Sequence, residues 1–514
     1  MAEREGIGKM ASDIPKQSIG TMLRPYSMLW STVAGLACAR SGVIVGSYGS
    51  YASTDQGIFT DGATIASTLL LLVVLGILTF RDMHLTKRRV NAVMRVSIIG
   101  QICCLAVLGY LESCSTDMFE LRFAFHALNE FTGILNMAYW LRRIRGSSTT
   151  TAVVLLFSAF ALSEVAIYAC SLAPNPWDNA AAVAMTVAQI PLIRLARKNS
   201  RAFELATPTQ ASDYFGFMED NISNSSFLVI TGLGVGFMSI VIGILRGFPG
   251  GVPIDFTPFT RVAYMLLAIV VSAVLVVLVL RGHRRLMTVN IWIVMQALAC
   301  LSLLAYAVWP VNLENGAMFA TTLNALMVAF DWYVIVAFMS YGWRDPYYYA
   351  IGGFTVFLLP RALARAAEES LAVAGVDSMT MMALMAGGIV ISTQFVLLQL
   401  LRIHEQGMSR KPEERQSDGF ITRVMGLDDR AGSFSGLRMV SMQHNTREMG
   451  KRFLLSDREV EVLTLYAMGY TQQRVADELF ISPGTVHAHI KRIYSKTGLH
   501  SRQAILDYLE QYPE

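Results

Sequence analysis

The stretch "ATIASTLLLLVVLGILTF", residues 63–80, runs for eighteen positions without a charged side chain. A second stretch of the same kind, "VAYMLLAIVVSAVLVVLVL", occupies residues 262–280. The hydrocarbon core of a bilayer is crossed by about 20 apolar residues of helix. Both stretches approach that length, so each is predicted to form a helix that crosses a membrane.

The composition extends this prediction to most of the chain. Of the 514 residues, 54% are hydrophobic and 16% are charged, and the mean hydropathy is +0.45. These values exclude an ordinary soluble enzyme. An all-α fold with a twelve-helix transmembrane bundle is predicted, with spans at about 27–48, 62–80, 92–111, 118–141, 149–170, 178–195, 226–246, 258–280, 288–309, 316–341, 347–367 and 379–401.

The charges of the connecting loops give the orientation of these spans. Fourteen Lys and Arg lie in loops that follow even-numbered spans, at 81–90, 142–145, 194–201 and 281–285. The loops after spans one, three, five and nine contain none. Because basic loops remain on the cytoplasmic side, we expect a multi-pass protein of the inner (cytoplasmic) membrane, in contact with lipid, with both termini in the cytoplasm.

The sequence offers no evidence of catalysis or of a metal site. The cysteines form no CxxC pair and lie in or beside apolar runs, as small residues of membrane helices do: Cys38, Cys103, Cys104, Cys114, Cys170 and Cys300. No catalytic constellation and no glycine-rich phosphate loop before a suitable helix is present. We therefore predict neither an enzyme, nor a metal site, nor a cofactor.

The twelve predicted spans divide into two halves. The longest internal loop, about 197–227, separates six spans from six, and each half has a basic loop between its second and third spans. This 6+6 layout resembles the major facilitator superfamily over about residues 20–402, and Gly76, Arg81, Asp82 and Arg88 match part of its loop motif. The resemblance implies a central cavity between two pseudo-repeats.

Several ionisable residues fall inside the predicted spans, where a charge at the helix centre costs about 2.5–3.5 kcal/mol or more. They are Arg40, His126, Glu130, Glu164, Asp331, Arg361 and Arg365. In the superfamily, spans 1, 4, 7 and 10 line the cavity. The resemblance thus implies a ligand site of Arg40, His126, Glu130 and Asp331, with the aromatic wall of Trp332. The alternative is interhelical ion pairing alone, such as Arg40 with Glu130.

The composition changes after the last span. Residues 402–450 are charged and contain Gly, Pro and Ser, which predicts a flexible cytoplasmic linker, as residues 1–26 predict a polar N-terminal segment. A last domain is predicted over 451–514. Within it, "SDRE" at 456–459 is a capping box, in which a serine and a glutamate satisfy amides at the start of a helix.

The remainder of this domain is predicted to form three more helices. Thr471 starts the second helix, and Ser482 followed by Pro483 starts the third. A helix pair joined by a tight turn, with a basic second helix, indicates a helix-turn-helix. The segment 483–506 supports this because it contains four basic residues and no acid.

The stretch "LSDREVEVLTLYAMGYTQQRVADELFISPGTVHAHIKRIYSKTGLHSRQAIL" resembles the LuxR-type DNA-binding domain almost throughout. The resemblance implies base contacts by His487, Ala488 and Lys491, a backbone contact by Thr485, and phosphate contacts by Arg492 and Lys496. It also implies dimerisation through the last helix, at Ala504, Ile505 and Tyr508. His487 stands where many members have Lys.

Twelve spans followed by such a domain are similar to membrane-embedded LuxR-type regulators of Coriobacteriia. The resemblance implies a one-component transcriptional regulator whose bundle senses a small molecule, with aromatic molecules among the candidates. It also implies that the C-terminal domain binds double-stranded promoter DNA as a homodimer. Two alternatives are open: a major-facilitator-type transporter with a regulatory DNA-binding domain, and a regulator in which the spans only anchor the chain.

Overall fold

A computed structural model of the chain describes residues 30–48, 61–81, 85–114, 118–172, 177–198, 225–251, 256–287, 290–341 and 344–408, residues 446–508 with gaps, and a few isolated positions between and before these ranges. The chain divides into two compact units, a helical bundle and a C-terminal domain. The predicted N-terminal segment and the linker from 409 onward lie almost wholly outside the described residues.

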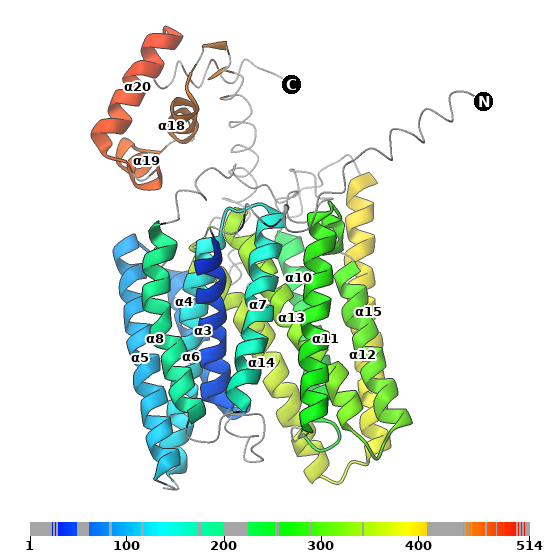
Figure 1. The fold of residues 1–514 in the computed structure, drawn as a ribbon. Helices are drawn as coiled ribbons and strands as arrows, with labels where there is room; N and C mark the ends of the chain where they lie inside the picture. Colours follow the sequence, from blue (N-terminus) through cyan, green and yellow to red (C-terminus); the bar gives the residue numbers. More distant parts are fainter. Residues whose placement is uncertain are drawn as a thin grey trace, which may run out of the picture. The chain divides into compact units, whose positions relative to one another are not determined.

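The described part of the bundle contains twelve long helices, which coincide with the twelve predicted apolar segments (Figure 1). They are α3 (Trp30–Tyr48), α4 (Ala63–Phe80), α5 (Lys87–Ser113), α6 (Phe119–Ile144), α7 (Thr149–Ser171), α8 (Trp177–Lys198), α10 (Ser225–Gly247), α11 (Pro258–Leu280), α12 (Asn290–Val308), α13 (Glu314–Tyr341), α14 (Pro346–Val373) and α15 (Ser378–Met408). A short 3-10 turn, η4 (Arg284–Met287), precedes α12.

Eight of these helices are long and apolar enough to cross a membrane, and α10 and α15 contain shorter apolar segments. The bundle is therefore that of a multi-pass membrane protein, while the number of twelve spans stays a prediction. Helix α15 continues to Met408, seven residues beyond the predicted end of the last span. The helices satisfy their own backbone groups, which is what a lipid environment requires.

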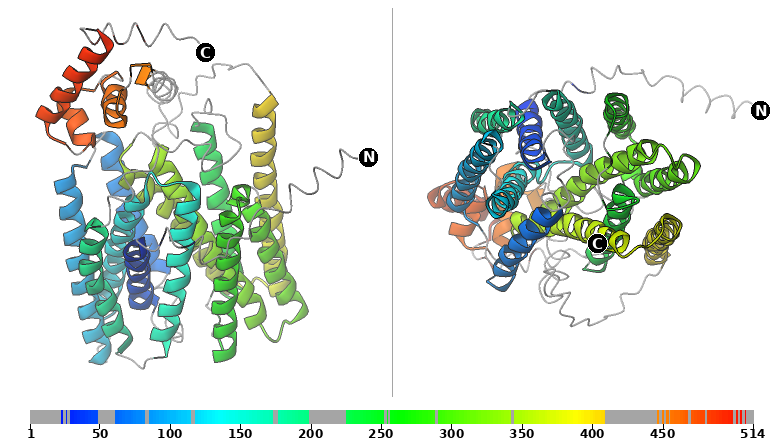
Figure 2. Two further views of the ribbon diagram at one scale, coloured as in Figure 1. Left: turned by 45° about the horizontal axis from the view of Figure 1, so that its top comes forward. Right: turned by 90° about the horizontal axis from the view of Figure 1, so that it is seen from below.

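The helices of the first half lie beside those of the second (Figure 2). Within the first half, α3 packs on α6, α7 and α8. Contacts of three helices of the second half join the halves: α11 packs on α7, α13 packs on α6 and α7, and α14 packs on α4 and α6. Helix α13 is the innermost of the apolar helices, since 89% of its most apolar stretch of 18 residues is buried inside the bundle. Charged side chains on α13 and α14 are thereby placed inside the bundle.

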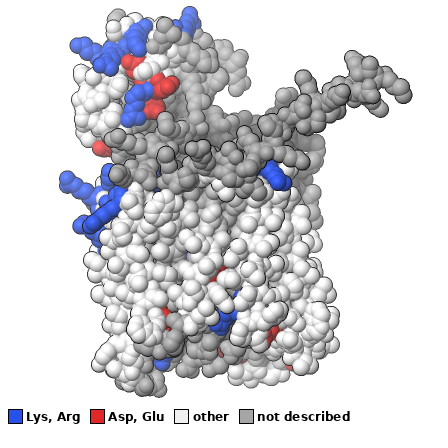
Figure 3. Space-filling model, viewed as in Figure 1, with Lys and Arg blue, Asp and Glu red and all other residues white. Residues whose placement is uncertain are grey.

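The outer surface of the bundle is apolar. Helix α4, for example, exposes Leu69, Val73, Ile77 and Phe80 along one side. Figure 3 shows a wide surface with almost no charged side chain, and Lys and Arg gathered near the start of α5 and the end of α8. Exposed basic residues there include Lys87, Arg88, Arg89, Arg194 and Arg197. An uncharged belt bounded by basic residues is typical of a surface that contacts lipid.

The C-terminal domain contains α18 (Asp457–Ala467), α19 (Gln472–Leu479) and α20 (Pro483–Thr497). Its core is formed by side chains from all three helices, together with Met449 and Ile505. The hydroxyl groups of Thr446 and Thr464 lie 2.8 Å apart and are both buried. The packed domain therefore begins at or before Thr446, upstream of the predicted boundary. Of the predicted fourth helix, only residues 502, 505 and 508 are described, and each is helical.

Candidate functional site

Helix α20, which the sequence predicted to contact DNA, begins where the sequence predicted. Ser482 caps it, because the Ser482 hydroxyl accepts a hydrogen bond of 3.1 Å from the Thr485 amide. Pro483 follows at the first position, where a missing N–H group has no cost. The helix buries Val486, Ile490 and Ile493 against the core. This spacing directs the opposite side of α20 to solvent.

All six residues that the sequence predicted for DNA contact are exposed. They are Thr485, His487, Ala488, Lys491, Arg492 and Lys496, all on α20. Neither Lys491 nor Arg492 forms a salt bridge within the described part of the chain. Side chains at such positions can enter a groove without first breaking an interaction of their own domain.

Lys496 differs from its neighbours because its charge is already paired. Its Nζ lies 2.7 Å from Oε2 of Glu459, the acid of the capping box on α18. The Ser456 amide also donates to this carboxylate, at 2.8 Å. Burial alone would raise the pKa of Glu459, but the hydrogen bonds from Lys496 and Ser456 outweigh it and lower the pKa. Lys496 thus also joins α20 to α18.

The three residues predicted to mediate dimerisation are placed differently from one another. Ala504 lies outside the described residues. Ile505 is fully buried in the core of its own domain. Tyr508 is partly buried, and its ring lies 5.5 Å from that of Phe453. A dimer contact through this helix would therefore use Tyr508 or side chains beyond the described residues, with Ile505 holding the helix in place from beneath.

In the bundle, Arg40 pairs with Glu164, whereas the example of a pair that the sequence offered was Arg40 with Glu130. Nη2 of Arg40 lies 2.6 Å from Oε1 of Glu164, and both side chains are almost completely buried. Nη1 of Arg40 donates to the Ser163 hydroxyl at 2.5 Å. Glu130 accepts hydrogen bonds of 3.1 Å from the hydroxyls of Thr64 and Ser67. Both charges therefore have partners on neighbouring helices.

The other three predicted ligand residues are also buried in the bundle: His126, Asp331 and Trp332. Trp332 packs edge-on against Phe160, with ring centroids 6.4 Å apart. Oδ2 of Asp331 and Nε1 of Trp332 have no hydrogen-bond partner among the described residues. None of the five predicted ligand residues lines the cavity described next.

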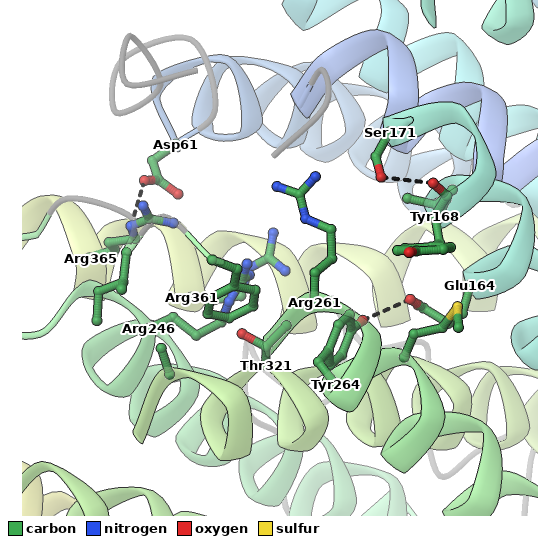
Figure 4. Close-up of a pocket in the computed structure, with 16 residues that line it drawn as sticks. Asp61, Glu164, Tyr168, Ser171, Arg246, Arg261, Tyr264, Thr321, Arg361 and Arg365 are labelled. Carbon is green, nitrogen blue, oxygen red and sulfur yellow. Dashed lines mark hydrogen bonds and ion pairs between the residues drawn. The ribbon is translucent and has the colours of Figure 1, made fainter. Parts of the chain in front are cut away.

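A cavity that is partly open to solvent lies between the two halves. Its walls come from α7, α10, α11, α13, α14 and the segments before α4 and before α11 (Figure 4). The polar lining residues are Asp61, Glu164, Tyr168, Ser171, Arg246, Arg261, Tyr264, Thr321, Arg361 and Arg365. The lining helices begin or end here, at the end of the bundle opposite to the basic loops.

The arginines of the cavity come from three helices. Nε of Arg365 lies 3.2 Å from Oδ2 of Asp61 and donates to the Gly251 carbonyl at 3.2 Å. Nη1 of Arg361 donates to the neutral amide oxygen of Asn324 at 3.0 Å. A Cβ on Gly243 would stand 2.5 Å from the Arg361 carbonyl, so only glycine lets α10 approach α14 this closely. In Figure 4 the guanidinium group of Arg261 extends into the open space.

A hydrogen-bonded chain connects the cavity to the buried ion pair. The Tyr264 hydroxyl on α11 donates to Oε2 of Glu164 at 2.8 Å, while Oε1 holds Arg40 (Figure 4). Residues of α3, α7 and α11 are thereby joined across the boundary between the halves. A molecule that contacts Tyr264 in the cavity would act directly on this connection.

At the opposite end, where the basic loops lie, the two halves are held together. The Leu85 amide donates to Oδ2 of Asp345 at 2.8 Å, and the Gly146 amide donates to the Ser340 hydroxyl at 3.0 Å. Arg344 donates to the Thr79 carbonyl at 3.3 Å. We refer to these three hydrogen bonds as the basic-end clamp. The bundle is thus closed at one end and hollow at the other.

The sequence contains one feature that could have indicated the cavity, namely arginines at the helix ends on the side where the loops lack basic residues. Glu164, Arg361 and Arg365 were recognised as ionisable residues inside spans, without a role. Arg246 and Arg261 lie at helix ends on the side where the loops lack basic residues. Arginines on that side run against the charge asymmetry of membrane proteins. Their position is therefore the feature that could have indicated a site.

Comparison with known proteins identifies the C-terminal domain. Residues 454–509 match the family described as GerE: Bacterial regulatory proteins, luxR family. The Fimbriae Z protein of Escherichia coli (strain K12) is 42% identical over 59 residues, which are 12% of this chain and 28% of that protein. The Oxygen regulatory protein NreC of Staphylococcus aureus (strain JH9) is 44% identical over 55 residues, 11% of this chain and 25% of that protein. The matches thus cover about a quarter of each relative.

The bundle has a more distant neighbour among solved structures. This is a Major Facilitator Superfamily transporter, FucP, in the outward conformation, with 11% sequence identity and a TM-score of 0.40, covering 74% of this chain and 99% of that chain. A likeness of this strength carries no argument about the bundle, whose description rests on its own helix packing. For the C-terminal domain the sequence match and the exposed face of α20 agree. Residues 454–509 form a LuxR-family helix-turn-helix domain attached to a multi-pass membrane bundle.

Proposed function

We propose that the protein is a membrane-embedded, one-component transcriptional regulator. The bundle senses a small molecule, and the C-terminal domain binds promoter DNA as a homodimer. The observation that carries this proposal is a LuxR-family domain with an exposed basic recognition helix, on the same chain as a membrane bundle with a cavity. A protein that held DNA only by an anchor would have no use for a charged cavity between its halves.

The predicted orientation of the chain supports ligand sensing by the bundle and DNA binding by the C-terminal domain. With the basic loops in the cytoplasm, the C-terminus lies on the side of the DNA, and the cavity lies at the other face of the membrane. A ligand would then arrive from outside the cell, and no separate messenger would be required. The single chain would carry both the receptor and the DNA reader.

A ligand can alter the state of the bundle only if it binds one conformation better than another. The two ends of the bundle offer such an element. The cavity separates the halves at one end, and the basic-end clamp of Leu85–Asp345, Gly146–Ser340 and Arg344–Thr79 joins them at the other. Closure of the cavity around a ligand would pull on the clamp. In this orientation the clamp lies at the cytoplasmic end of the bundle.

The test is occupancy of DNA by the full chain in its own membrane. Chromatin immunoprecipitation with wild type should recover discrete promoters, and Lys491→Ala should lose them at unchanged protein abundance. Arg88→Ala, which removes an exposed cation from the bundle, is the matched control and should retain them. If Lys491→Ala recovers the same promoters as wild type, the proposed DNA-reading function is wrong.

The second candidate is a transporter that carries a regulatory DNA-binding domain. The cavity between two six-helix halves favours it. The two functions separate in one strain: a transporter would retain uptake in the Lys491→Ala variant, because the substitution lies outside the bundle. A regulator would lose its transcriptional response in that variant and would show no uptake of the inducing molecule in reconstituted vesicles.

A further inference from the structure

The cavity between the two halves has a chemical character that indicates its ligand. We infer that it binds a small organic anion, with the anionic group held by arginines of α11 and α14 and an apolar or aromatic body against Tyr168, Tyr264 and Phe256. This inference rests on the proposed sensor function, because it names the class of molecule that the sensor reads.

The first support is the charge of the lining. The walls contain four arginines, Arg246, Arg261, Arg361 and Arg365, and two carboxylates, Asp61 and Glu164. Glu164 already neutralises Arg40, which lies outside the cavity. The lining therefore has an excess of positive charge within an apolar bundle. Charges interact far more strongly there than in water, so an anion that enters is attracted and a cation is repelled.

The second support is hydrogen-bonding capacity that points to an oxyanion. Arg365 is 7% exposed, and its Nη2 has no hydrogen-bond partner among the described residues. Arg361 contacts a neutral amide and the ring of Phe357, and its charge also interacts with the Asp61 carboxylate. A guanidinium presents its N–H groups as a planar fork that matches a carboxylate or phosphate. A buried fork with an unused N–H group is a site prepared for such a ligand.

The third support is the apolar part of the wall. The rings of Phe256 and Tyr264 lie 6.4 Å apart, and Tyr168 lines the cavity from α7. Ile167, Ile254 and Met265 complete the apolar surface. Sites that combine mostly apolar walls with a few polar groups bind small organic molecules and orient them. The combination excludes a bare inorganic ion as the best occupant.

The same geometry suggests how the anion would be sensed. Asp61 on the segment leading into α4 belongs to the first half, and Arg365 on α14 belongs to the second. An incoming oxyanion would compete with Asp61 for Arg365 while its body contacts Tyr264. Both contacts join the halves, so binding would change the balance of forces between them.

The electrostatic claim can be tested without knowing the ligand. In a chain whose six cysteines are replaced by serine, Ser171→Cys places a thiol in the cavity, and Val311→Cys places one on a fully exposed loop at the same end. Each is treated with an anionic and a cationic methanethiosulfonate reagent of similar size. The anionic-to-cationic rate ratio should be at least tenfold higher at Ser171→Cys than at Val311→Cys.

Two results would overturn the electrostatic claim. The first is an equal ratio at the two positions. The second is no reaction of Ser171→Cys with either reagent, because an anion of that size could then not enter. Adding Arg261→Gln and Arg361→Gln should lower the ratio at Ser171→Cys to that of the control position. Arg281→Gln, at the other end of α11 and exposed, should leave it unchanged.

Ligand class is tested with purified full-length protein in lipid nanodiscs. Benzoate, phthalate and succinate are compared with neutral benzamide by calorimetry and by thermal unfolding. We expect a carboxylate with a ring to bind best, benzamide not to bind, and Arg361→Gln to weaken carboxylate binding at least tenfold. Arg281→Gln should bind as wild type does.

Failure of the inference and failure of the proposed function give different results. If no carboxylate binds up to millimolar concentration, or benzamide binds equally well, the inference is wrong even where promoter occupancy responds to another compound. If a carboxylate binds through Arg361 but never alters promoter occupancy, the anion site stands and the sensor role is wrong.

Discussion

The bundle and the C-terminal domain treat charge in opposite ways. The domain carries Lys491 and Arg492 on its surface, without salt bridges in the described chain, and buries an apolar core. The bundle exposes a largely apolar surface between its ends and buries several charges inside its helices, each of which needs a partner or a cavity. Exposed charges are available to contact a second molecule, whereas a buried charge has a desolvation cost that a partner within the fold must offset. Arg40 with Glu164 shows such a partner, and the arginines around the cavity are the charges that we infer a ligand would meet.

The largest expected effect comes from breaking the buried pair. Arg40→Met should lower the free energy of unfolding by about 3–5 kcal/mol, because it leaves the Glu164 carboxylate buried without its cation. Thermal unfolding of the full chain in detergent measures it. The double variant Arg40→Met, Glu164→Met should recover most of the loss, since an apolar pair has no desolvation cost. Equal stability of wild type and Arg40→Met would show that the pair contributes nothing.

On the exposed side, Lys491→Ala should reduce discrimination between specific and random DNA by about 1–3 kcal/mol. The side chain lies on the solvent side of α20, away from Val486 and Ile490, so folding should be unaffected. Competition binding with specific and random duplexes measures the loss, and circular dichroism of a fragment from 445 to 514 provides the folding control. If affinity falls equally for both duplexes, Lys491 contacts phosphate and not bases.

Lys496 is exposed and also paired with Glu459, so replacing it should have a smaller effect, divided between folding stability and DNA binding. Lys496→Ala should cost about 1 kcal/mol of folding stability, since the half-exposed pair with Glu459 holds α20 on α18. It should also weaken binding to all DNA sequences alike and lower the salt slope by about 1 if Lys496 contacts phosphate. An unchanged salt slope would assign Lys496 to folding alone.

The same pair predicts an acid dependence of the C-terminal domain. The pKa of Glu459 is lowered in the folded state, so its contribution is present above the usual Glu value of 4.5 and is lost as pH falls through the lowered pKa. Glu459→Gln should flatten the decline of stability below about pH 4.5 relative to wild type. Urea unfolding across this range measures it, and an unchanged acid decline would assign it to other carboxyl groups.

Asp331→Asn should have the smallest effect on sensing. Asp331 is buried away from the cavity, so the response to ligand should persist. Removing a charge that lacks a described partner on Oδ2 should leave stability unchanged or slightly raised. A reporter strain that expresses the variant measures both response and abundance. Loss of the response to ligand at normal protein abundance would show that Asp331 belongs to the ligand site, as the sequence predicted.

The sequence was most informative where one local rule decides one structural feature. Ser456 with Glu459 and Ser482 with Pro483 mark helix starts, and the structure places caps at both. The length and polarity of the apolar runs likewise predicted the bounds of the bundle helices to within a few residues, apart from the extended ends of α5, α14 and α15. These features depend on neighbours in the chain.

Partners in the bundle could not be predicted in this way, because they depend on how helices rotate and pack. The sequence listed Arg40, Glu130 and Glu164 as buried charges but could not say which two meet, since a pair separated by 124 positions leaves no local trace. The rotation of each helix decides which face enters the cavity. The fully buried place of Ile505 follows from the same packing.

By itself, the sequence determined that this chain is a membrane bundle of long apolar helices joined to a LuxR-family DNA reader, because hydrophobic length, loop charge and capping residues act locally. Tertiary structure alone decided which buried charges neutralise each other and which surround an opening. That choice is made by contacts between helices far apart in the chain, such as Arg365 of α14 with Asp61 before α4. A buried charge is costly unless it meets a suitable partner, and packing decides which partner it meets.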